Sequence, residues 1–566
     1  MKKTNKAVCL LLGASMFASI ASGCAGGGDS TITKINVLNF GGGVGSVWLE
    51  NAIERFEEEY KDKSYADGKK GVKVSYDARM GVLSTGISTA GDMVYFDESS
   101  PASNGLIASG SLLDISDIVT PIEDKILPQT KDAMKGNDGK YYALPHYEYY
   151  FGLAYNIDVF ERYNLYFSAP EETSVVNYPS AYGTAKFIKS PTGKKACGVD
   201  GEYGTYDDGL PTSLQELMIL CDYMKMSKNV TPFVLSGKYT NYSIYMNSGL
   251  WTSLAGFDEI STLYTFDGDV ELVTGYSSEN LLPGVAIPKP TTATEKITLE
   301  TGYKVYDSAA RYYSLAMLKQ AMDAGWFSTA GLGSSVSHTG AQARFILSGV
   351  NGAEEVAMLV EGSYWYSESQ VAGNFDDYEM LTGQKARVGW MPLPTSLNTT
   401  VTPGNGSSVA LLDSSGGSCY INANIADNPE LVSACKDFVS FCYRENELKE
   451  FTKTTGIARG MIYSMDESDF EGNTYGSTLW NLRDGGKNVV FCSATNDIFR
   501  SSPGAFEINL TGSAVFKPVD VEGRVTYASY YHAFKEGGMT CAEILEQTKL
   551  STEATWKANY EQFFNK

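Results

Sequence analysis

The sequence predicts an α/β fold from the order in which strand and helix patterns follow one another near its start. Residues 32–40 form an alternating, β-favouring run that ends at the glycine triplet 41–43, which is typical of a strand running into a tight turn. Apolar residues then recur at helical spacing over 49–60, and the runs 71–76 and 92–96 have the composition of further strands. The order strand, helix, strand, strand is typical of an α/β layer.

Helices later in the chain are marked by their terminal residues. Ser213 and Glu216 form a capping box at the start of one helix, and Asn428 stands at the N-cap of another, with a proline after it. A further helix is expected over 307–324, because a glycine follows its last turn. The final helix is expected over about 540–564.

Three stretches lie outside this regular pattern, at about 163–210, 257–306 and 462–532. They are rich in Gly, Ser, Thr, Tyr and Asp, which favour turns and irregular structure. We expect them to form surface loops, small β-hairpins or parts of a binding rim.

Charge and composition exclude several kinds of partner. The chain has 566 residues, with 45 basic and 67 acidic residues and a formal net charge of −22. Nucleic acid is therefore not expected, because phosphate binding needs a concentrated basic field. The three histidines lie far apart and no Cys-x-x-Cys pair is present, so neither a metal nor a cofactor is expected. Tyrosine is abundant, because its 37 residues outnumber 25 Phe and 7 Trp together.

The first residues have the pattern of an export signal. Three lysines precede the apolar run 7–20, which is too short to span a bilayer with comfort, and small residues then lead to Cys24. The sequence Ala-Ser-Gly-Cys over 21–24 resembles the lipobox of bacterial lipoproteins. It implies a signal peptide over 1–23, lipidation of Cys24 and a flexible tether over 24–30. The alternative is an ordinary secreted protein cleaved nearby. No later run has the length and apolar character of a transmembrane helix.

Two motifs in the middle of the chain carry a specific resemblance. Asp138-Gly-Lys-Tyr-Tyr-Ala-Leu-Pro145 is followed by Leu153-Ala-Tyr-Asn-Ile-Asp-Val-Phe160. This pattern resembles the extracellular solute-binding proteins (family 1) of bacterial carbohydrate ABC importers, the group that includes maltose-binding protein. The chain departs from the family in its greater length and in Ser213-Leu214, where Thr-Trp is usual. Further blocks agree with the family in the same order, at 84–113, 211–217, 356–365, 388–394 and 416–443.

The resemblance implies a periplasmic-binding-protein-like α/β fold, with two α/β lobes joined by a multi-strand hinge and a ligand cleft between them. Lobe one is expected at about 31–144 plus 417–490. Lobe two is expected at about 145–416 plus 491–566, and the three irregular stretches would be insertions. Chain crossings near Pro145 and Ser415 are expected to form hinge strands.

The same resemblance implies a substrate-binding lipoprotein of an ABC transporter, which captures a sugar, and by preference an oligosaccharide, outside the cell. Its partners would be the carbohydrate ligand and the permease subunits, with the membrane reached by the lipid anchor only. We expect a monomer without catalytic residues, on the outer face of the bacterial cytoplasmic membrane, extracellular or periplasmic. The alternatives are an exported carbohydrate-active enzyme, a non-sugar solute-binding lipoprotein and a structural surface lipoprotein. A glycoside hydrolase needs two carboxylates across the bond, and no acid here stands in a recognisable catalytic motif.

Sugar binding requires flat aromatic rings for the C–H face of a pyranose and polar side chains for its hydroxyl groups. The resemblance places such residues at the ends of strands, after the hinge proline and at the start of a helix in lobe two. Each of several candidates also has a purely structural interpretation. Trp365 could be a core residue, and Asp97 or Glu98 could be a helix N-cap. Trp251 and Arg459 could serve in packing or in a surface ion pair. The candidates for ligand binding are Trp365, Tyr364, Tyr147, Tyr149, Tyr150, Asp97, Glu98, Phe40, Asn39, Trp251 and Arg459.

Overall fold

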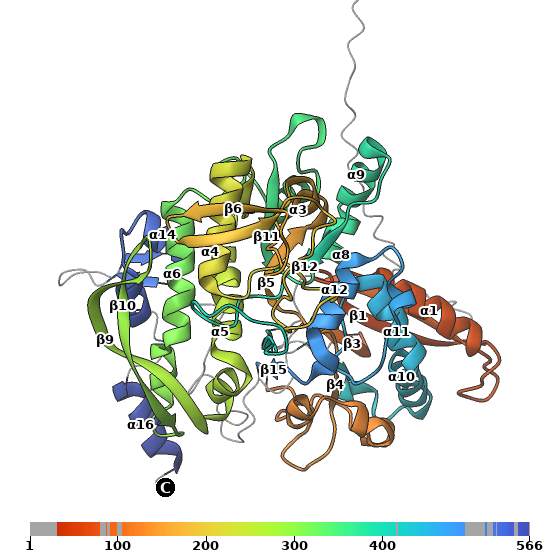
Figure 1. Ribbon diagram of the computed structural model, residues 1–566. Coiled ribbons are helices and arrows are strands. Elements are labelled where there is room, and N and C mark those ends of the chain that lie inside the picture. The colour runs from red at the N-terminus through yellow and green to blue at the C-terminus, as the bar shows by residue number, and fades with distance from the viewer. Residues whose placement is uncertain are drawn as a thin grey trace, which may run out of the picture.

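Two mixed β-sheets, each covered by helices, organise the computed structural model of the protein (Figure 1). Each sheet with the helices packed on it is a lobe, so the predicted α/β class is confirmed. The expected signal peptide, the tether and Cys24 lie outside the described residues. The structure describes residues 31–79, 87, 91–98, 105–414, 417–492, 515–517, 525–527, 529–547 and 553–564.

The sheet of lobe one has the strand order β2-β1-β3-β14-β4. Strand β1 runs parallel to β2 and β3, whereas β14 is antiparallel to both β3 and β4. Because β14 comes late in the sequence, the chain leaves this lobe after β4 and later returns to it. The strands are β1 (Thr33–Phe40), β2 (Val72–Arg79), β3 (Val94–Asp97), β4 (Ala143–Pro145) and β14 (Ser418–Ile421).

Helices from both ends of the sequence pack on this sheet. Phe56 of α1 meets Phe438 and Phe441 of α10 edge to face, at ring-centroid distances of 5.0 and 5.5 Å. The side chain of Asn428 accepts a hydrogen bond from the Leu431 N–H, which confirms the predicted N-cap. The helices of this lobe are α1 (Val47–Glu59), α2 (Ser116–Val119), α10 (Pro429–Cys442) and α11 (Glu445–Thr455).

The sheet of lobe two has the order β12-β5-β11-β8. Every residue of β5 (Phe151–Asn156) and β11 (Val356–Gly362) is buried, as expected for central strands covered on both faces. Strand β11 is antiparallel to β5 and parallel to β8 (Thr231–Val234), and β12 (Val388–Trp390) closes the other edge.

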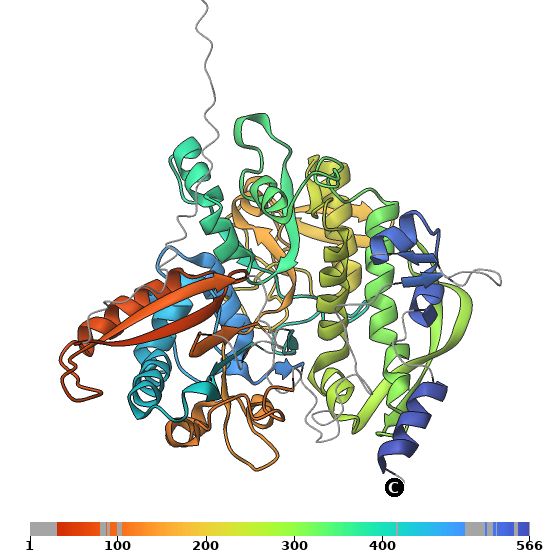
Figure 2. The same ribbon diagram turned by 180° about the vertical axis from the view of Figure 1, so that it is seen from behind.

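Long helices cover this second sheet. Helices α5 and α6 lie side by side, and α5 bends where Gly256 takes a φ of 78° (Figure 2). The predicted capping box of Ser213 and Glu216 opens α4, and the helix expected over 307–324 is α6. The helices are α3 (Ile157–Tyr163), α4 (Leu214–Asp222), α5 (Ser243–Thr265), α6 (Ala309–Asp323), α7 (His338–Ile346), α8 (Trp365–Val371) and α9 (Asn374–Thr382).

All three irregular stretches contain antiparallel strand pairs, of which two are hairpins and the third, within 462–532, joins residues 515–517 to 525–527. The first hairpin is β6 (Val175–Ser180) with β7 (Gly183–Ile188), and the second is the longer pair β9 (Gly268–Leu282) and β10 (Val285–Ile297). The second hairpin curves around the outer side of α6 (Figure 1).

The C-terminal part contributes shorter elements. The prediction of one final helix over 540–564 is wrong, because the structure describes two helices there. In the part of the chain that the structure describes, no helix combines the length and apolar character needed to cross a bilayer. The elements are α12 (Thr474–Arg483), β13 (Leu411–Asp413) paired with β15 (Val489–Phe491), β16 (Val515–Lys517) paired with β17 (Val525–Tyr527), α14 (Tyr530–Lys535), α15 (Cys541–Gln547) and α16 (Glu553–Phe564).

The lobes are connected by chain segments that bind one another through backbone hydrogen bonds. Residues 146–150 join β4 to β5, and the return crossing joins β13 to β14. The Ser414 N–H donates to the Tyr149 carbonyl oxygen at 3.0 Å, and the His146 N–H donates to that of Gly417 at 2.8 Å. A third stretch joins them, because the Glu148 N–H donates to the Ala458 carbonyl oxygen at 3.0 Å.

Candidate functional site

Strand ends from both lobes meet beside the first crossing, where open α/β sheets place their ligands. On the lobe-one side β3 ends at Asp97 and is followed by Glu98. On the lobe-two side β11 ends at Gly362, and Tyr364 comes two residues later. We refer to the side chains gathered here as the interlobe cluster. It consists of Glu98, Glu361, Glu368, Gln342, His338, Tyr147, Tyr149, Tyr242, Tyr245 and Tyr364.

Aromatic rings form one side of the interlobe cluster. The ring of Tyr149 lies 5.2 Å from that of Tyr364, edge to face, and 6.0 Å from that of Tyr147. Tyr245 stacks on Tyr242 at 4.5 Å, and the phenol oxygens of Tyr245 and Tyr364 are 3.3 Å apart. These five rings come from the crossing, from the start of α5 and from the end of β11. The site therefore presents several ring faces and hydroxyl groups within a small volume.

Carboxylates form the other side. The Nε2 group of Gln342 donates to Oε1 of Glu361 at 3.3 Å and to Oε2 of Glu368 at 3.1 Å. The hydroxyl of Tyr147 donates to Oε1 of Glu98 at 3.5 Å. Glu361 and Gln342 lie on β11 and α7, and Glu368 on α8, so lobe two supplies two acids and lobe one the third.

Burial raises the pKa of each of these three acids. Burial, assisted by the nearby Asp97 carboxylate, raises the pKa of Glu98 to about 7. Burial also raises the pKa of Glu368 to about 7, and burial together with the charge of Glu368 raises the pKa of Glu361 well above its usual value. Burial and the charge of Lys238 lower the pKa of His338, so this imidazole is neutral at neutral pH. The site is rich in acids and has no permanent cation among its members.

The loop after β1 approaches the same place. Gly43 has a φ of +55°, and a Cβ at this position would lie 2.5 Å from the phenol oxygen of Tyr147. Asn39 holds this loop, because its Nδ2 group donates to the Gly45 carbonyl oxygen at 2.9 Å and to Oγ of Ser46 at 3.1 Å. Phe40, the last residue of β1, is half-buried beside it.

Four of the residues predicted from the sequence lie together here, namely Tyr147, Tyr149, Tyr364 and Glu98. Asp97 lies next to them, buried, where its carboxylate accepts from the Tyr420 hydroxyl at 2.9 Å. The structure therefore brings together the hinge tyrosines, the end of β3 and the end of β11, as the expected cleft requires.

Other predicted residues are buried in the cores of the lobes. Trp365 is fully buried, with its ring near those of Phe345 and Tyr475 at 5.4 and 5.5 Å. Tyr150 is buried and donates its hydroxyl proton to the Glu148 carboxylate. Trp251 lies in a separate core of lobe two, where its Nε1 group donates to Oγ of Ser308 at 3.2 Å.

Arg459 is also buried, among aromatic rings of lobe one. Its guanidinium lies 4.4 Å from the ring centre of Phe451, 4.6 Å from that of Trp48 and 4.8 Å from that of Tyr443. This arrangement is a cation–π packing site. Its backbone pairs with that of Tyr147, so Arg459 supports the crossing from behind.

Six of the ten members of the interlobe cluster are not among the residues predicted from the sequence. They are Glu361, Glu368, Gln342, His338, Tyr242 and Tyr245. A glutamate or glutamine on a helix is ordinarily a solvated residue, so its type gave no signal. Glu361 offered a weak signal, because it is an acid inside the otherwise apolar run 356–360.

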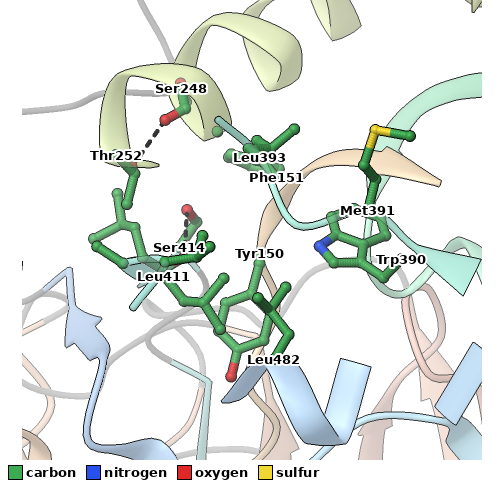
Figure 3. Close-up of a pocket in the computed structure, with 14 residues that line it drawn as sticks. Tyr150, Phe151, Ser248, Thr252, Trp390, Met391, Leu393, Leu411, Ser414 and Leu482 are labelled. Carbon is green, nitrogen blue, oxygen red and sulfur yellow. Dashed lines mark hydrogen bonds between the residues drawn. The ribbon is translucent and has the colours of Figure 1, made fainter. Parts of the chain in front are cut away.

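A small cavity of about 10 Å³, which has room for about one water molecule, adjoins the first crossing on the lobe-two side (Figure 3). Its wall is largely apolar, with Phe151, Met391 and Leu411 among its residues, and no charged residue lines it. The hydroxyl of Thr252 is used within α5, because it donates to the Ser248 carbonyl oxygen at 2.8 Å. Phe151 also stacks on Tyr245 at 4.0 Å, so one ring separates this cavity from the interlobe cluster.

A metal centre is not indicated by the geometry. Among the residues that the structure describes, no three His, Cys, Asp or Glu side chains are placed to hold a metal ion.

No family model and no curated protein sequence matches the chain. Solved structures are similar to it. A chitin oligosaccharide binding protein has a TM-score of 0.51 and 14% identity, covering 93% of this chain and 99% of that one. The GacH receptor of Streptomyces glaucescens, solved unliganded and with acarbose, has a TM-score of 0.50 and 13% identity, covering 95% and 99%. Maltose-bound T. maritima MalE3 has a TM-score of 0.50 and 14% identity, covering 94% and 100%. Over nearly its whole length, the chain therefore has the two-lobe α/β fold of these sugar-binding proteins.

Proposed function

We propose that the protein is the substrate-binding subunit of an ABC importer and captures an oligosaccharide outside the cell. The observation that carries the proposal is the interlobe cluster, in which the rings of Tyr147, Tyr149 and Tyr364 lie beside three carboxylates between two sheets. Rings can cover the C–H face of a pyranose, and carboxyl groups can bind its hydroxyls. The fold, shared with structures of oligosaccharide-binding proteins, supports the proposal.

On this proposal, the ligand enters when the lobes separate at the crossings and is enclosed when they close. Tyr364 is 7% exposed and Tyr147 is 1% exposed, so the ring faces are inaccessible while the lobes are together. Bending of segment 146–150 and of the return crossing would open the cluster, because its members come from both lobes. We propose lobe one at about 31–144 plus 417–490, and lobe two at about 145–416 plus 491–566.

We further propose distinct roles for the predicted residues. Tyr147, Tyr149, Tyr364 and Glu98 contact the sugar, whereas Asn39 and Asp97 position the loop and strand end that face it. The burial of Trp365, Tyr150 and Arg459 supports a packing role for them behind these contacts, and Phe40 lies half-buried beside the loop after β1. Trp251 would instead stabilise a separate core of lobe two.

The protein would act as a monomeric lipoprotein without catalytic chemistry. The signal pattern over 1–23 supports lipidation of Cys24 and attachment to the outer face of the bacterial cytoplasmic membrane. The loaded protein would dock on permease subunits and release the sugar to them. The solved structures to which the chain is similar are binding proteins, which supports binding rather than turnover.

A glycan panel read by thermal unfolding tests the proposal. We expect one class of oligosaccharide to raise the melting temperature of the full-length protein, since a ligand that binds only the folded state stabilises it by about 2.7 kcal/mol at one hundred times its Kd. Tyr149→Ala should abolish most of this shift, while Tyr203→Ala, at an exposed ring far along the chain, should retain it. If a peptide or polyol raises the melting temperature and no carbohydrate does, the sugar assignment is wrong; cleavage of the bound glycan would identify an enzyme instead.

A further inference from the structure

The interlobe cluster has more hydrogen-bond acceptors than donors. Because the Nε2 group of Gln342 donates to both Glu361 and Glu368, its orientation is fixed and its Oε1 atom points elsewhere. Gln342 is fully buried, yet this Oε1 atom has no hydrogen-bond partner. A buried acceptor left in this way costs about 1–3 kcal/mol, so a ligand that donates to it would gain affinity.

The three carboxylates also lack a permanent positive partner. Among the described residues, no lysine or arginine lies within ion-pair distance of Glu98, Glu361 or Glu368, and the nearest basic group is Nε2 of His338, 4.0 Å from Glu368. Glu148 provides a contrast within this chain, because it is buried like Glu361 but pairs with Arg483 at 2.7 Å. The described part of the fold thus supplies a counter-charge to Glu148 but none to Glu98, Glu361 or Glu368.

A bare metal ion is not suited to supply the missing positive charge, because the described acids are not placed to converge on one ion. A cation inside a larger organic molecule can instead approach acids that stand on different sides of the site. The rings of Tyr242, Tyr245 and Tyr364 lie close by, and ring faces attract organic cations through their quadrupole.

We infer that the cleft selects oligosaccharides that carry a protonated amino group, such as those built from glucosamine, over neutral oligosaccharides of the same size. The inference rests on the proposed function and names the class of sugar. An ammonium group donates three hydrogen bonds and accepts none, which complements the Glu361 and Glu368 carboxylates and the amide oxygen of Gln342. A hydroxyl or an N-acetyl group at the same carbon supplies fewer donors and no charge.

Titration calorimetry on the full-length protein tests this with three β-1,4-linked tetramers: the glucosamine tetramer, its fully N-acetylated form and the glucose tetramer. Glucosamine, galactosamine and mannosamine are compared in the same way with glucose, galactose and mannose. In at least one set the amine should bind at least about tenfold more tightly than its neutral counterparts, because charge-assisted hydrogen bonds contribute about 1.5–3 kcal/mol. Glu368→Gln should remove this preference. Asp377→Asn, at an exposed acid on α9 with the same change in net charge, should keep it.

The outcomes separate the two proposals. If neutral oligosaccharides bind and no amine binds more tightly, the inference is overturned while the proposed function stands. If no member of these sets binds and no glycan of the wider panel stabilises the protein, both fall together. If Glu368→Gln unfolds, Glu98→Gln on the other lobe provides the same comparison.

Discussion

Arg483 and Glu148 form a doubly hydrogen-bonded ion pair in the connection between the lobes. The Nε group of Arg483 donates to Oε2 of Glu148 and its Nη2 group donates to Oε1, both at 2.7 Å, and each side chain is 1% exposed. Nη2 also donates to the carbonyl oxygen of Met461 at 2.8 Å. One guanidinium at the end of α12 therefore holds both the first crossing and the stretch that runs beside it.

Glu148→Gln should destabilise the protein by about 3–5 kcal/mol, because it leaves the buried guanidinium without its counter-charge. Urea unfolding followed by circular dichroism measures the change as a lower midpoint. The control is Asp62→Asn, which breaks the exposed pair of Asp62 with Lys70 and should leave the midpoint unchanged. Equal midpoints for Glu148→Gln and the wild type would show that the pair does not brace the connection.

Gly43→Ala should weaken sugar binding, because the added Cβ would lie 2.5 Å from the Tyr147 phenol oxygen and displace that ring. Gly68→Ala is the matched control, since Gly68 also has a positive φ, of +78°, but a Cβ there meets nothing within 4 Å. Both variants should lose about 1 kcal/mol of stability from backbone strain. Calorimetry should find reduced affinity for Gly43→Ala alone; equal affinities would place the ligand away from Tyr147.

The stability of the ligand-free protein should fall as pH rises from about 4.5 to 7. Glu98 has a pKa raised from 4.5 to about 7, so the folded protein holds a proton that the unfolded chain releases in this range. The stabilisation is complete below the unfolded pKa and is lost as pH passes the folded one. Glu98→Gln should match the wild type near pH 4 and exceed it near pH 8 by about 3 kcal/mol. Chemical denaturation at several pH values measures both slopes, and identical slopes would mean that Glu98 is solvated in solution.

Trp365→Ala and Tyr364→Ala should distinguish a residue that supports the site by packing from a residue that contacts the sugar. Trp365 is fully buried among rings, so its loss should cost about 3–5 kcal/mol of stability and leave the affinity of the folded protein for sugar largely intact. Tyr364→Ala should lower the affinity at least about tenfold, because it removes a ring face from the cluster. A large loss of affinity in folded Trp365→Ala would instead make Trp365 a ligand contact.

The sequence predicted the parts of the molecule that depend on local pattern. The capping box at Ser213, the N-cap at Asn428 and the end of β3 at Asp97 each follow from neighbouring residues, so the fold and four of the ten members of the interlobe cluster could be anticipated. Three of the other six members, His338, Gln342 and Glu368, depend on which face of α7 and α8 turns inward, and tertiary packing decides that. Gln342 and Glu368 therefore looked like ordinary helix-surface residues. Trp251 was grouped with the site because of its ring, but it packs around Ser308 in a separate core.

A crystal structure of the protein with its tightest-binding oligosaccharide tests the central claim most directly. We expect a sugar ring against Tyr149 and Tyr364, with its polar groups within hydrogen-bond distance of Glu98 and Glu368 and the two lobes closed around it. A sugar found in the apolar cavity lined by Phe151 and Met391, or on an outer face of either lobe, would contradict the account.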